Sequence, residues 1–270
     1  MKEMKPEPVV MAVGAHPDDI ELMAAGTLLL CKEAGAQIHA WSFSDGRYGS
    51  VDMGAEETAR LRVEEARASA ALAGAVFHHP ITEDQSIYYE PSLIKKAASV
   101  LRSVRPGILL LPAPDDYMED HVNTSRILVT AAFLRAASGY ETEPPADPWS
   151  GDIVVYHVMP FGLRDQLGKM VAAEGYADIT GVADLKGRML RCHASQESWL
   201  DVTQGTVSQT ELMLEMCREV GAMSGKFDLA EGWRAHSHIG FSARPIDSLA
   251  EMLREKFHVD AVYRDGLNLT

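Results

Sequence analysis

The sequence predicts an α/β fold, formed as a single domain, in which helices cover both faces of a mostly parallel sheet. Apolar strand-like runs alternate with helix-like segments from residue 9 to residue 137, the pattern of a parallel sheet with crossover helices. Two polar segments, 15–19 and 112–121, each follow a predicted strand. Ligands bind beyond the carboxyl ends of such strands, so both segments are expected on one rim of the sheet.

Each expected strand is a short apolar run between polar or turn-forming residues. Residues 9–14 form a continuous apolar run that stops at a His and two Asp, and residues 108–111 follow an Arg-Pro-Gly turn. The remaining expected strands are residues 37–43, 75–77 and 153–158, a short one near 178–180, and one within 227–260.

The expected helices are bounded by Gly or Pro or rich in helix-forming residues. Residues 20–33 stop at Gly35, residues 56–73 close at Gly74, and residues 91–104 begin with a proline suited to a first helical turn. The others are 120–137, 182–193, 203–221 and one near 246–256. The polar loop 139–150, with three prolines, is expected to be either a lid or a simple connection.

Composition excludes several classes of partner. The 25 basic and 39 acidic residues give a net charge of -14, which argues against a nucleic-acid surface and fits plain solubility. Three separated cysteines without a CxxC pair suit a reducing compartment. No run approaches the roughly 18 apolar residues of a membrane span, and the first residues do not resemble a signal peptide. We therefore expect a cytoplasmic protein.

The turn after the first strand carries the main chemical signal. His16, Asp18 and Asp19 surround a proline that stiffens the turn. A single Asp here could simply cap the following helix. A capping role does not explain His16, or why two Asp residues, Asp18 and Asp19, are present. A histidine and a carboxylate are good ligands for a divalent metal, and a second carboxylate can act as a general base on a water whose pKa the metal lowers towards about 7.

A third ligand is needed, because catalytic zinc commonly takes three protein ligands. His121 follows the strand 108–111 and lies at the start of a helix on the same rim. Taken alone it reads as a capping or surface histidine. Together with His16 and Asp19 it completes a ligand set.

At this point the sequence resembles the LmbE-like, or PIG-L, family of metal-dependent N-acetylglucosaminyl deacetylases. The strongest matches are the AHPDD turn at 15–19 with the helix start IELMAAGTL that follows it, and the segment KGRMLRCHASQ at 186–196. Weaker matches are residues 44–46, 62–65, 72–74, 104–106, 118–121, 178–180, Glu231 and Arg234. The resemblance covers residue 8 to about residue 240.

The resemblance implies a Rossmann-like three-layer sandwich over residues 1–270, with 226–270 as a C-terminal extension packed on the domain. It implies hydrolysis of an N-acetyl group from a small amino-sugar conjugate, such as one of N-acetylglucosamine. It also implies Zn²⁺, although iron(II) or another divalent metal suits such ligands too, and a homo-oligomer, a trimer or hexamer.

The resemblance also suggests roles for single residues. His16, Asp19 and His121 match its metal ligands, and Asp18 matches its general base. Arg62 and Asp84 lie where the family places groups that contact the substrate or order the site, and His193 is expected to contact the substrate. Arg62 reads equally well as a solvated helix arginine. Asp120, beside His121, is expected to order a neighbouring group or to cap the helix.

One position departs from the family pattern. Where the family has a histidine thought to steady the oxyanion or protonate the leaving amine, this chain has Met118, which can do neither. The candidates for a replacement donor are Tyr48, Tyr117, His193, His236 and His238. Alternation places His236 and His238 on one face, either facing solvent or entering the active site of the same or a neighbouring subunit.

Three readings of the function stay open. The first is the amino-sugar deacetylase. The second is a metal-dependent amide or ester hydrolase with a non-sugar substrate, which Met118 and the loop 139–150 leave open. The third is a non-catalytic relative that binds a small molecule. A dinucleotide site and a serine hydrolase are excluded, because neither GxGxxG after the first strand nor GxSxG occurs.

Overall fold

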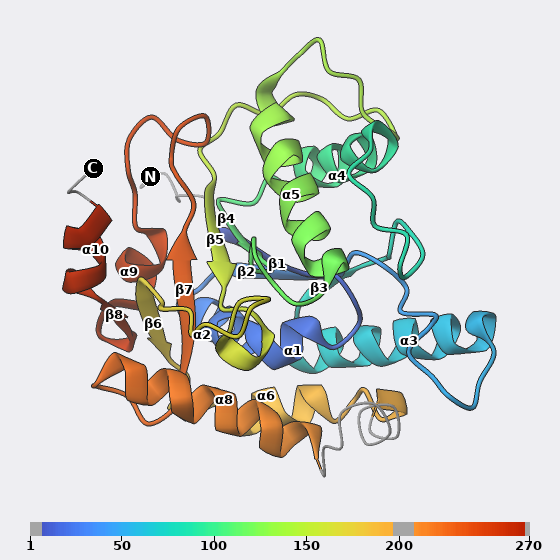
Figure 1. Ribbon diagram of the computed structural model, residues 1–270. Helices are drawn as coiled ribbons and strands as arrows, with labels where there is room; N and C mark the ends of the chain where they lie inside the picture. The colour runs from blue at the N-terminus through green and yellow to red at the C-terminus, as the bar shows by residue number, and fades with distance from the viewer. Residues whose placement is uncertain (1–6, 197–207, 268–270) are drawn as a thin grey trace.

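The computed structural model describes residues 7–196 and 208–267, and an eight-stranded sheet runs through its centre (Figure 1). The strands are β1 (Val9–Gly14), β2 (Gln37–Ser42), β3 (Val76–His78), β4 (Ile108–Leu111), β5 (Val154–Val158), β6 (Gly175–Asp178), β7 (Ala230–Ala235) and β8 (Phe257–Val259). Their order across the sheet is β3-β2-β1-β4-β5-β7-β6-β8.

The sheet has a parallel part and an antiparallel part. Strands β3, β2, β1, β4 and β5 pair in parallel, so their carboxyl ends share one edge. Beyond β5, the strands β7, β6 and β8 pair in antiparallel fashion. The parallel part therefore provides the rim on which a site is expected.

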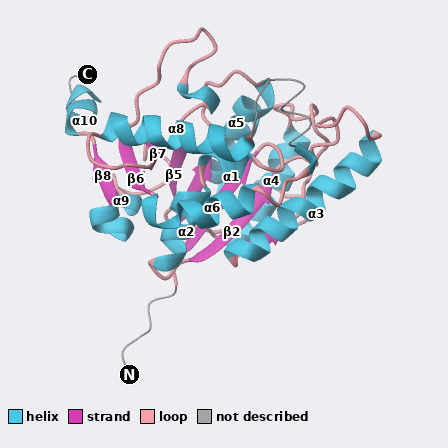
Figure 2. Cartoon of the chain, turned by 90° about the horizontal axis from the view of Figure 1, so that it is seen from below, coloured by secondary structure: helices cyan, strands magenta, loops and turns pink. Residues whose placement is uncertain are grey.

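Helices cover both faces of the sheet. The α-helices are α1 (Asp19–Met23), α2 (Ala25–Glu33), α3 (Ala55–Ala73), α4 (Pro91–Val104), α5 (Glu119–Phe133), α6 (Ala183–Leu190), α8 (Gln209–Ser224), α9 (Ser248–Leu253) and α10 (Ala261–Leu267). In Figure 1, α4 and α5 lie above the sheet, whereas α2, α3, α6 and α8 lie below it. Figure 2 views this lower layer face on, with its helices in front of the strands.

Alternating side chains of the central strand β1 pack into two separate hydrophobic cores, one on each face of the sheet. Val10 and Ala12 of β1 pack with α2, α6 and α8, while Met11 and Val13 pack with α4 and α5. A strand that is buried on both faces reads as a continuous apolar run, which is what the sequence shows at residues 9–14. The predicted Rossmann-like three-layer α/β fold is confirmed.

The element boundaries match the prediction closely in the first half of the chain and less closely in the second. The expected helix 20–33 is interrupted at Ala24, where α1 ends and α2 begins. Helix α8 begins at Gln209, and the expected start of that helix at 203–207 lies outside the described residues. The segment 226–270, expected as an extension packed on the domain, supplies β7 and β8 to the sheet, and β7 lies inside it.

The loop 139–150 packs along α4 and the end of α5. Arg102 of α4 donates to the carbonyl of Ala146, and Trp149 donates its backbone N–H to the carbonyl of Arg135. Over the described residues it contributes no side chain to the cleft at the carboxyl edge of the parallel strands, so it acts as a connection in this structure. None of the described helices has the length and apolar character that crossing a lipid bilayer requires.

Candidate metal centre and active site

The site forms where β1 ends and α1 begins, opposite the loop between β4 and α5. His16, Asp18 and Asp19 follow β1 directly, and His121 lies in the first turn of α5. The rings of His16 and His121 approach to 5.4 Å between centroids. The two polar segments predicted to share a rim therefore meet there.

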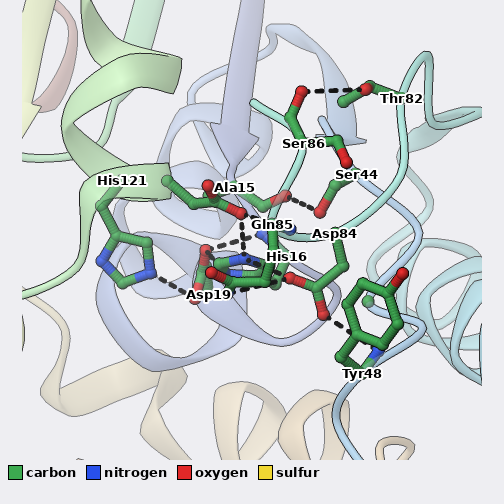
Figure 3. Close-up of polar contacts among 12 residues, drawn as sticks. Ala15, His16, Asp19, Ser44, Tyr48, Thr82, Asp84, Gln85, Ser86 and His121 are labelled. Carbon is green, nitrogen blue, oxygen red and sulfur yellow. Dashed lines mark hydrogen bonds and ion pairs between the residues drawn. The ribbon is translucent and has the colours of Figure 1, made fainter. Parts of the chain in front are cut away.

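Three side chains present donor atoms to one point. A ligand atom from each of His16, Asp19 and His121 lies within 4.8 Å of the others. Asp19 lies between the histidines, with Oδ2 3.6 Å from Nδ1 of His16 and Oδ1 3.4 Å from Nε2 of His121. Figure 3 shows the His121 ring pointing toward Asp19. Two imidazoles and a carboxylate at this spacing suit a divalent cation with room for further ligands.

The outer nitrogens of both histidines contact carboxylates. Nε2 of His16 lies 3.2 Å from Oδ1 of Asp84 and 3.2 Å from Oδ2 of Asp120. Nδ1 of His121 lies 2.9 Å from Oδ1 of Asp116. A metal-binding histidine usually donates its second ring N–H to such a partner, which fixes the ring and its tautomer. This leaves Nδ1 of His16 and Nε2 of His121 facing the candidate cation position.

A second group of His16, Asp84 and Asp120 also has its donor atoms within 4.8 Å. Its carboxylates are already hydrogen bonded, since Asp84 accepts from the backbone N–H of Tyr48 at 3.2 Å and Asp120 from that of Gln85 at 2.9 Å. These residues therefore fit the role of orienting His16 better than that of holding the cation.

Asp18 is held beside this centre in a constrained turn. Its backbone adopts φ 103°, a region that residues with a side chain rarely occupy. Arg62 of α3 donates to Oδ1 of Asp18 at 3.2 Å and to the carbonyl of Pro17 at 2.6 Å, which holds the turn in place. Arg62 reaches the turn past Gly46 and Gly49, where a Cβ atom would collide with the guanidinium.

Burial and neighbouring charges shift the pKa values of the site. Burial raises the pKa of the Asp18 carboxyl to about 6; the charge of Arg62 opposes this shift and that of Asp19 adds to it. Burial would lower the pKa of His121, but Asp19 and Asp116 outweigh it and raise that pKa to about 9. Asp19, although buried, has a pKa well below its usual range because His121 and His16 lie beside it.

The centre opens into a cleft of about 410 Å³. The candidate ligands, Asp18, Arg62 and Asp84 are among its lining residues, and the others are Leu22, Tyr48, Gly49, Gln85, Tyr117, Met118, Phe161 and Gln196. Tyr48 and Tyr117 are both half exposed. The Tyr117 ring meets the His121 ring edge to face, with 5.8 Å between centroids.

His193 lies elsewhere than expected of a substrate contact. It is fully buried and its Nε2 lies 3.3 Å from Oε2 of Glu21 in α1. It is absent from the described lining of the cleft. Its position indicates support of α1 from behind the turn and not direct contact with a ligand.

His236 and His238 line a different cleft, of about 880 Å³, between the start of β5 and the C-terminal segment. Nδ1 of His236 lies 3.1 Å from Nε2 of His157, a buried residue of β5. Within one chain, neither residue reaches the cleft that holds His16 and His121. Of the expected replacement donors, only Tyr48 and Tyr117 line that cleft.

Several residues of the site were not singled out from the sequence, among them Asp116, Gln85 and Phe161. Asp116 orients His121 and also accepts the backbone N–H of Phe161 at 3.1 Å, so it joins the loop after β5 to the metal centre. An acid five residues before His121 could have indicated a partner for that histidine, but the sequence alone does not distinguish Asp116 from the neighbouring Asp115. Nothing in the sequence pattern singled out Gln85 or Phe161.

Known proteins resemble this chain in sequence and in fold. Residues 11–132 match the family model described as PIG-L: GlcNAc-PI de-N-acetylase. A diacetylchitobiose deacetylase of Thermococcus kodakarensis is 25% identical over 196 residues, which is 69% of each chain.

Solved structures share the fold. The N,N'-diacetylchitobiose deacetylase of Pyrococcus horikoshii superposes with a TM-score of 0.72 at 19% identity, covering 90% of this chain and 89% of that one. The 4-carboxy-2-hydroxymuconate hydratase of Pseudomonas putida KT2440 gives 0.66 at 23% identity, with 89% and 99% covered. The stretch that matches the PIG-L family model includes the turn that carries His16, Asp18 and Asp19 and the part of α5 that carries His121.

Proposed function

We propose that this protein is a metal-dependent hydrolase that removes the acetyl group from an N-acetylated amino-sugar conjugate. The single observation that supports this most strongly is the set of three donor side chains beside a buried carboxylate, Asp18, at the floor of an open cleft. The relative described as a diacetylchitobiose deacetylase suggests which type of bond is cut.

His16, Asp19 and His121 would hold the metal ion, with zinc as the first choice and iron(II) as an alternative for the same ligands. When bound, such an ion lowers the pKa of a water towards about 7 and polarises a carbonyl oxygen. The carboxylates of Asp84, Asp120 and Asp116 keep the two imidazoles in the required orientation.

Asp18 is the proposed general base. It lines the cleft beside Asp19, and Arg62 fixes one of its carboxyl oxygens. In the proposed reaction the carboxylate takes a proton from the attacking water as the new C–O bond forms. The same carboxyl then returns that proton to the nitrogen as the C–N bond breaks, which gives a free amine and acetate.

The oxyanion needs a donor that Met118 cannot supply. Tyr117 is the better placed of the two cleft tyrosines, because its ring packs against His121. Burial, together with the charges of Asp19, Asp116 and Asp18, raises the pKa of the Tyr117 hydroxyl, so it keeps its proton and can donate a hydrogen bond.

Met118 also supports the runner-up, hydrolysis of an amide or ester of a non-sugar compound. The fold is compatible with other chemistry too, since a hydratase shares it. A binding role without catalysis is less favoured, because Asp18 is retained and held by Arg62 at a point where binding alone does not require a base.

The test is acetate release by zinc-loaded protein from N-acetylated amino sugars and their conjugates, alongside simple amides and esters. The wild type is compared with Asp18→Asn, which keeps the shape but cannot accept a proton. We expect the variant to keep its zinc and lose at least about 100-fold in kcat, the scale of general-base catalysis. Full activity in Asp18→Asn would refute the assignment, and release from esters alone would favour the runner-up.

A further inference from the structure

The cleft is strongly acidic. Asp18, Asp19 and Asp84 line it, and Asp116 and Asp120 lie directly behind the two histidines. One divalent ion would offset part of this charge. A low-dielectric site of one sign attracts ligands of the opposite sign and repels those of the same sign.

Arg62 is the only Lys or Arg among the described residues that line the cleft; both terminal nitrogens of its guanidinium are already hydrogen bonded, and its Nε is buried without a partner among the described residues. Nη1 donates to the carbonyl of Gly46 at 3.0 Å, and Nη2 donates to the carbonyl of Pro17 and to Asp18. The side chain is 4% exposed. It therefore does not present the open fork of donors with which an arginine receives a phosphate or carboxylate.

Arg47, in the loop between β2 and α3 that also carries Tyr48, is paired with three carboxylates. Its guanidinium lies 2.9 Å from Asp45, 2.9 Å from Glu83 and 3.4 Å from Glu56. Asp45 in turn accepts the backbone N–H of Asp84, so this ion-pair cluster adjoins the cleft wall. An arriving anion would have to displace three carboxylates to reach Arg47.

The remaining lining residues suit a neutral ring. Tyr48, Tyr117 and Phe161 offer aromatic surface, with the rings of Tyr117 and Phe161 5.9 Å apart between centroids. Gln85 and Gln196 add uncharged donors and acceptors. Apolar faces with a few placed polar groups are the usual lining of a small-molecule site.

We infer that the cleft takes N-acetylated amino sugars that are uncharged or positively charged, and that it discriminates against sugars bearing a phosphate or carboxylate next to the ring. The inference rests on the proposed function, because it concerns the substrate of that same site. It predicts that an amine already freed on a neighbouring sugar is tolerated, whereas an acidic substituent is not.

The test uses two substrates that differ in charge at one position: N-acetylmuramic acid and its methyl ester. We expect kcat/KM with zinc-loaded wild type to be at least about tenfold higher for the ester at low salt, and the ratio to narrow at 1 M salt, where screening acts within about 3 Å. If salt did not change this ratio, the preference would come from the shape of the substrate and not from its charge, and the inference would be overturned. An equal or higher kcat/KM for the acid would overturn it too.

Matched variants at Met118 sharpen this test, because its side chain lines the cleft. Met118→Lys should lower the ratio of kcat/KM for the ester to kcat/KM for the acid, because the added positive charge favours the acid. Met118→Gln should leave this ratio near that of the wild type. If wild type turns over neither sugar, their dissociation constants on wild-type protein decide. Tighter binding of the ester would keep the inference while the proposed function falls, and equal binding would refute the inference itself.

Discussion

Among single residues, the carboxylates behind the histidines have a role that can be separated from metal binding itself. Asp116 contacts the outer nitrogen of His121 and is almost completely buried. Asp116→Asn should weaken zinc affinity about 10- to 100-fold, because the imidazole loses the partner that fixes its tautomer and raises its basicity. Competition with a fluorescent chelator measures this.

The neighbouring acid provides the control. Asp115 is exposed and one position away, so Asp115→Asn removes the same charge from the same segment without touching His121. Its zinc affinity should stay within about twofold of the wild type, since exposed charges are screened. If both variants lost affinity equally, the effect would be one of overall charge and not of histidine orientation.

Tyr117 and Tyr48 can be distinguished as oxyanion donors by removing one hydroxyl at a time. We expect Tyr117→Phe to lower kcat about 100-fold with little change in KM, the loss seen when one oxyanion donor is removed. Tyr48→Phe, the matched control in the same cleft, should lose less than about threefold. The reverse ranking would transfer the role to Tyr48, and two active variants would exclude both hydroxyls.

The sequence was sufficient to predict that His16, Asp19 and His121 lie close together, for a simple reason. His16 and Asp19 are three positions apart in one turn, and His121 follows the strand that pairs with β1. The carboxyl ends of parallel neighbours meet, so their proximity follows from the topology. His236 and His238 could not be placed in this way, because the direction of their strand was unknown.

The direction of β7 explains where His236 and His238 lie. β7 runs antiparallel to β5, so Ala235 pairs with Tyr156 and the chain continues toward the start of β5. His236 then donates its backbone N–H to the carbonyl of Val155. The end of β7 thus lies away from the carboxyl edge of the parallel strands, which holds the metal centre.

At the scale of elements, the break between α1 and α2 has a tertiary cause. Glu231 of β7 accepts the backbone N–H groups of Gly26 at 2.8 Å and Thr27 at 2.7 Å, at the first turn of α2. Lys186 of α6 donates to the same carboxylate at 2.7 Å and is fully buried. A residue more than two hundred positions away satisfies donors that a local cap would satisfy, so helical spacing alone predicted one unbroken helix.

The buried ion pair of Glu231 and Lys186 should be important for stability. Glu231→Gln leaves the ammonium of Lys186 buried without its counter-charge, and we expect the free energy of unfolding to fall by about 3 kcal/mol. Urea denaturation at fixed zinc concentration measures it. Glu33→Gln, which breaks the exposed pair with Lys256, should cost less than about 1 kcal/mol. Equal small losses would show that the buried pair adds no more than the surface pair.

Over the whole molecule, the three-layer architecture was predictable because strand and helix periods alternate regularly in the first half of the chain. The second half was harder to predict, since β6, β7 and β8 are short and pair with segments distant in sequence. The position of β7 inside the sheet depends on non-local pairing that a local pattern does not encode. The C-terminal strands nevertheless complete the sheet, so the protein is expected to unfold as one unit.

The stability of that unit should decrease in mild acid because of His157. This residue is 4% exposed in β5, and burial, with the charges of His236 and Arg234, lowers its pKa to about 4, although the carbonyl of Pro112 opposes the shift. The unfolded chain binds the proton near its ordinary pKa of about 6.5 and the folded chain does not. The unfolded state therefore takes up more protons between these values, and the contribution of His157 to stability is full above pH 6.5 and is lost as the pH falls toward 4.

Between pH 7 and pH 5 the wild type should lose about 2 kcal/mol more unfolding free energy than His157→Gln, which keeps polar groups at the position but does not titrate. Urea denaturation at both pH values, with zinc held constant, gives the difference between the two proteins and cancels the effects of the other histidines. His238→Gln removes a histidine from the neighbouring cleft without contacting His157, so it should retain the acid sensitivity of the wild type. If wild type and His157→Gln lost the same unfolding free energy, His157 would have to be protonated or hydrated in the folded protein. That would contradict its burial between β5, β7 and α5, where the hydroxyl of Ser125 lies 3.2 Å from its Nδ1.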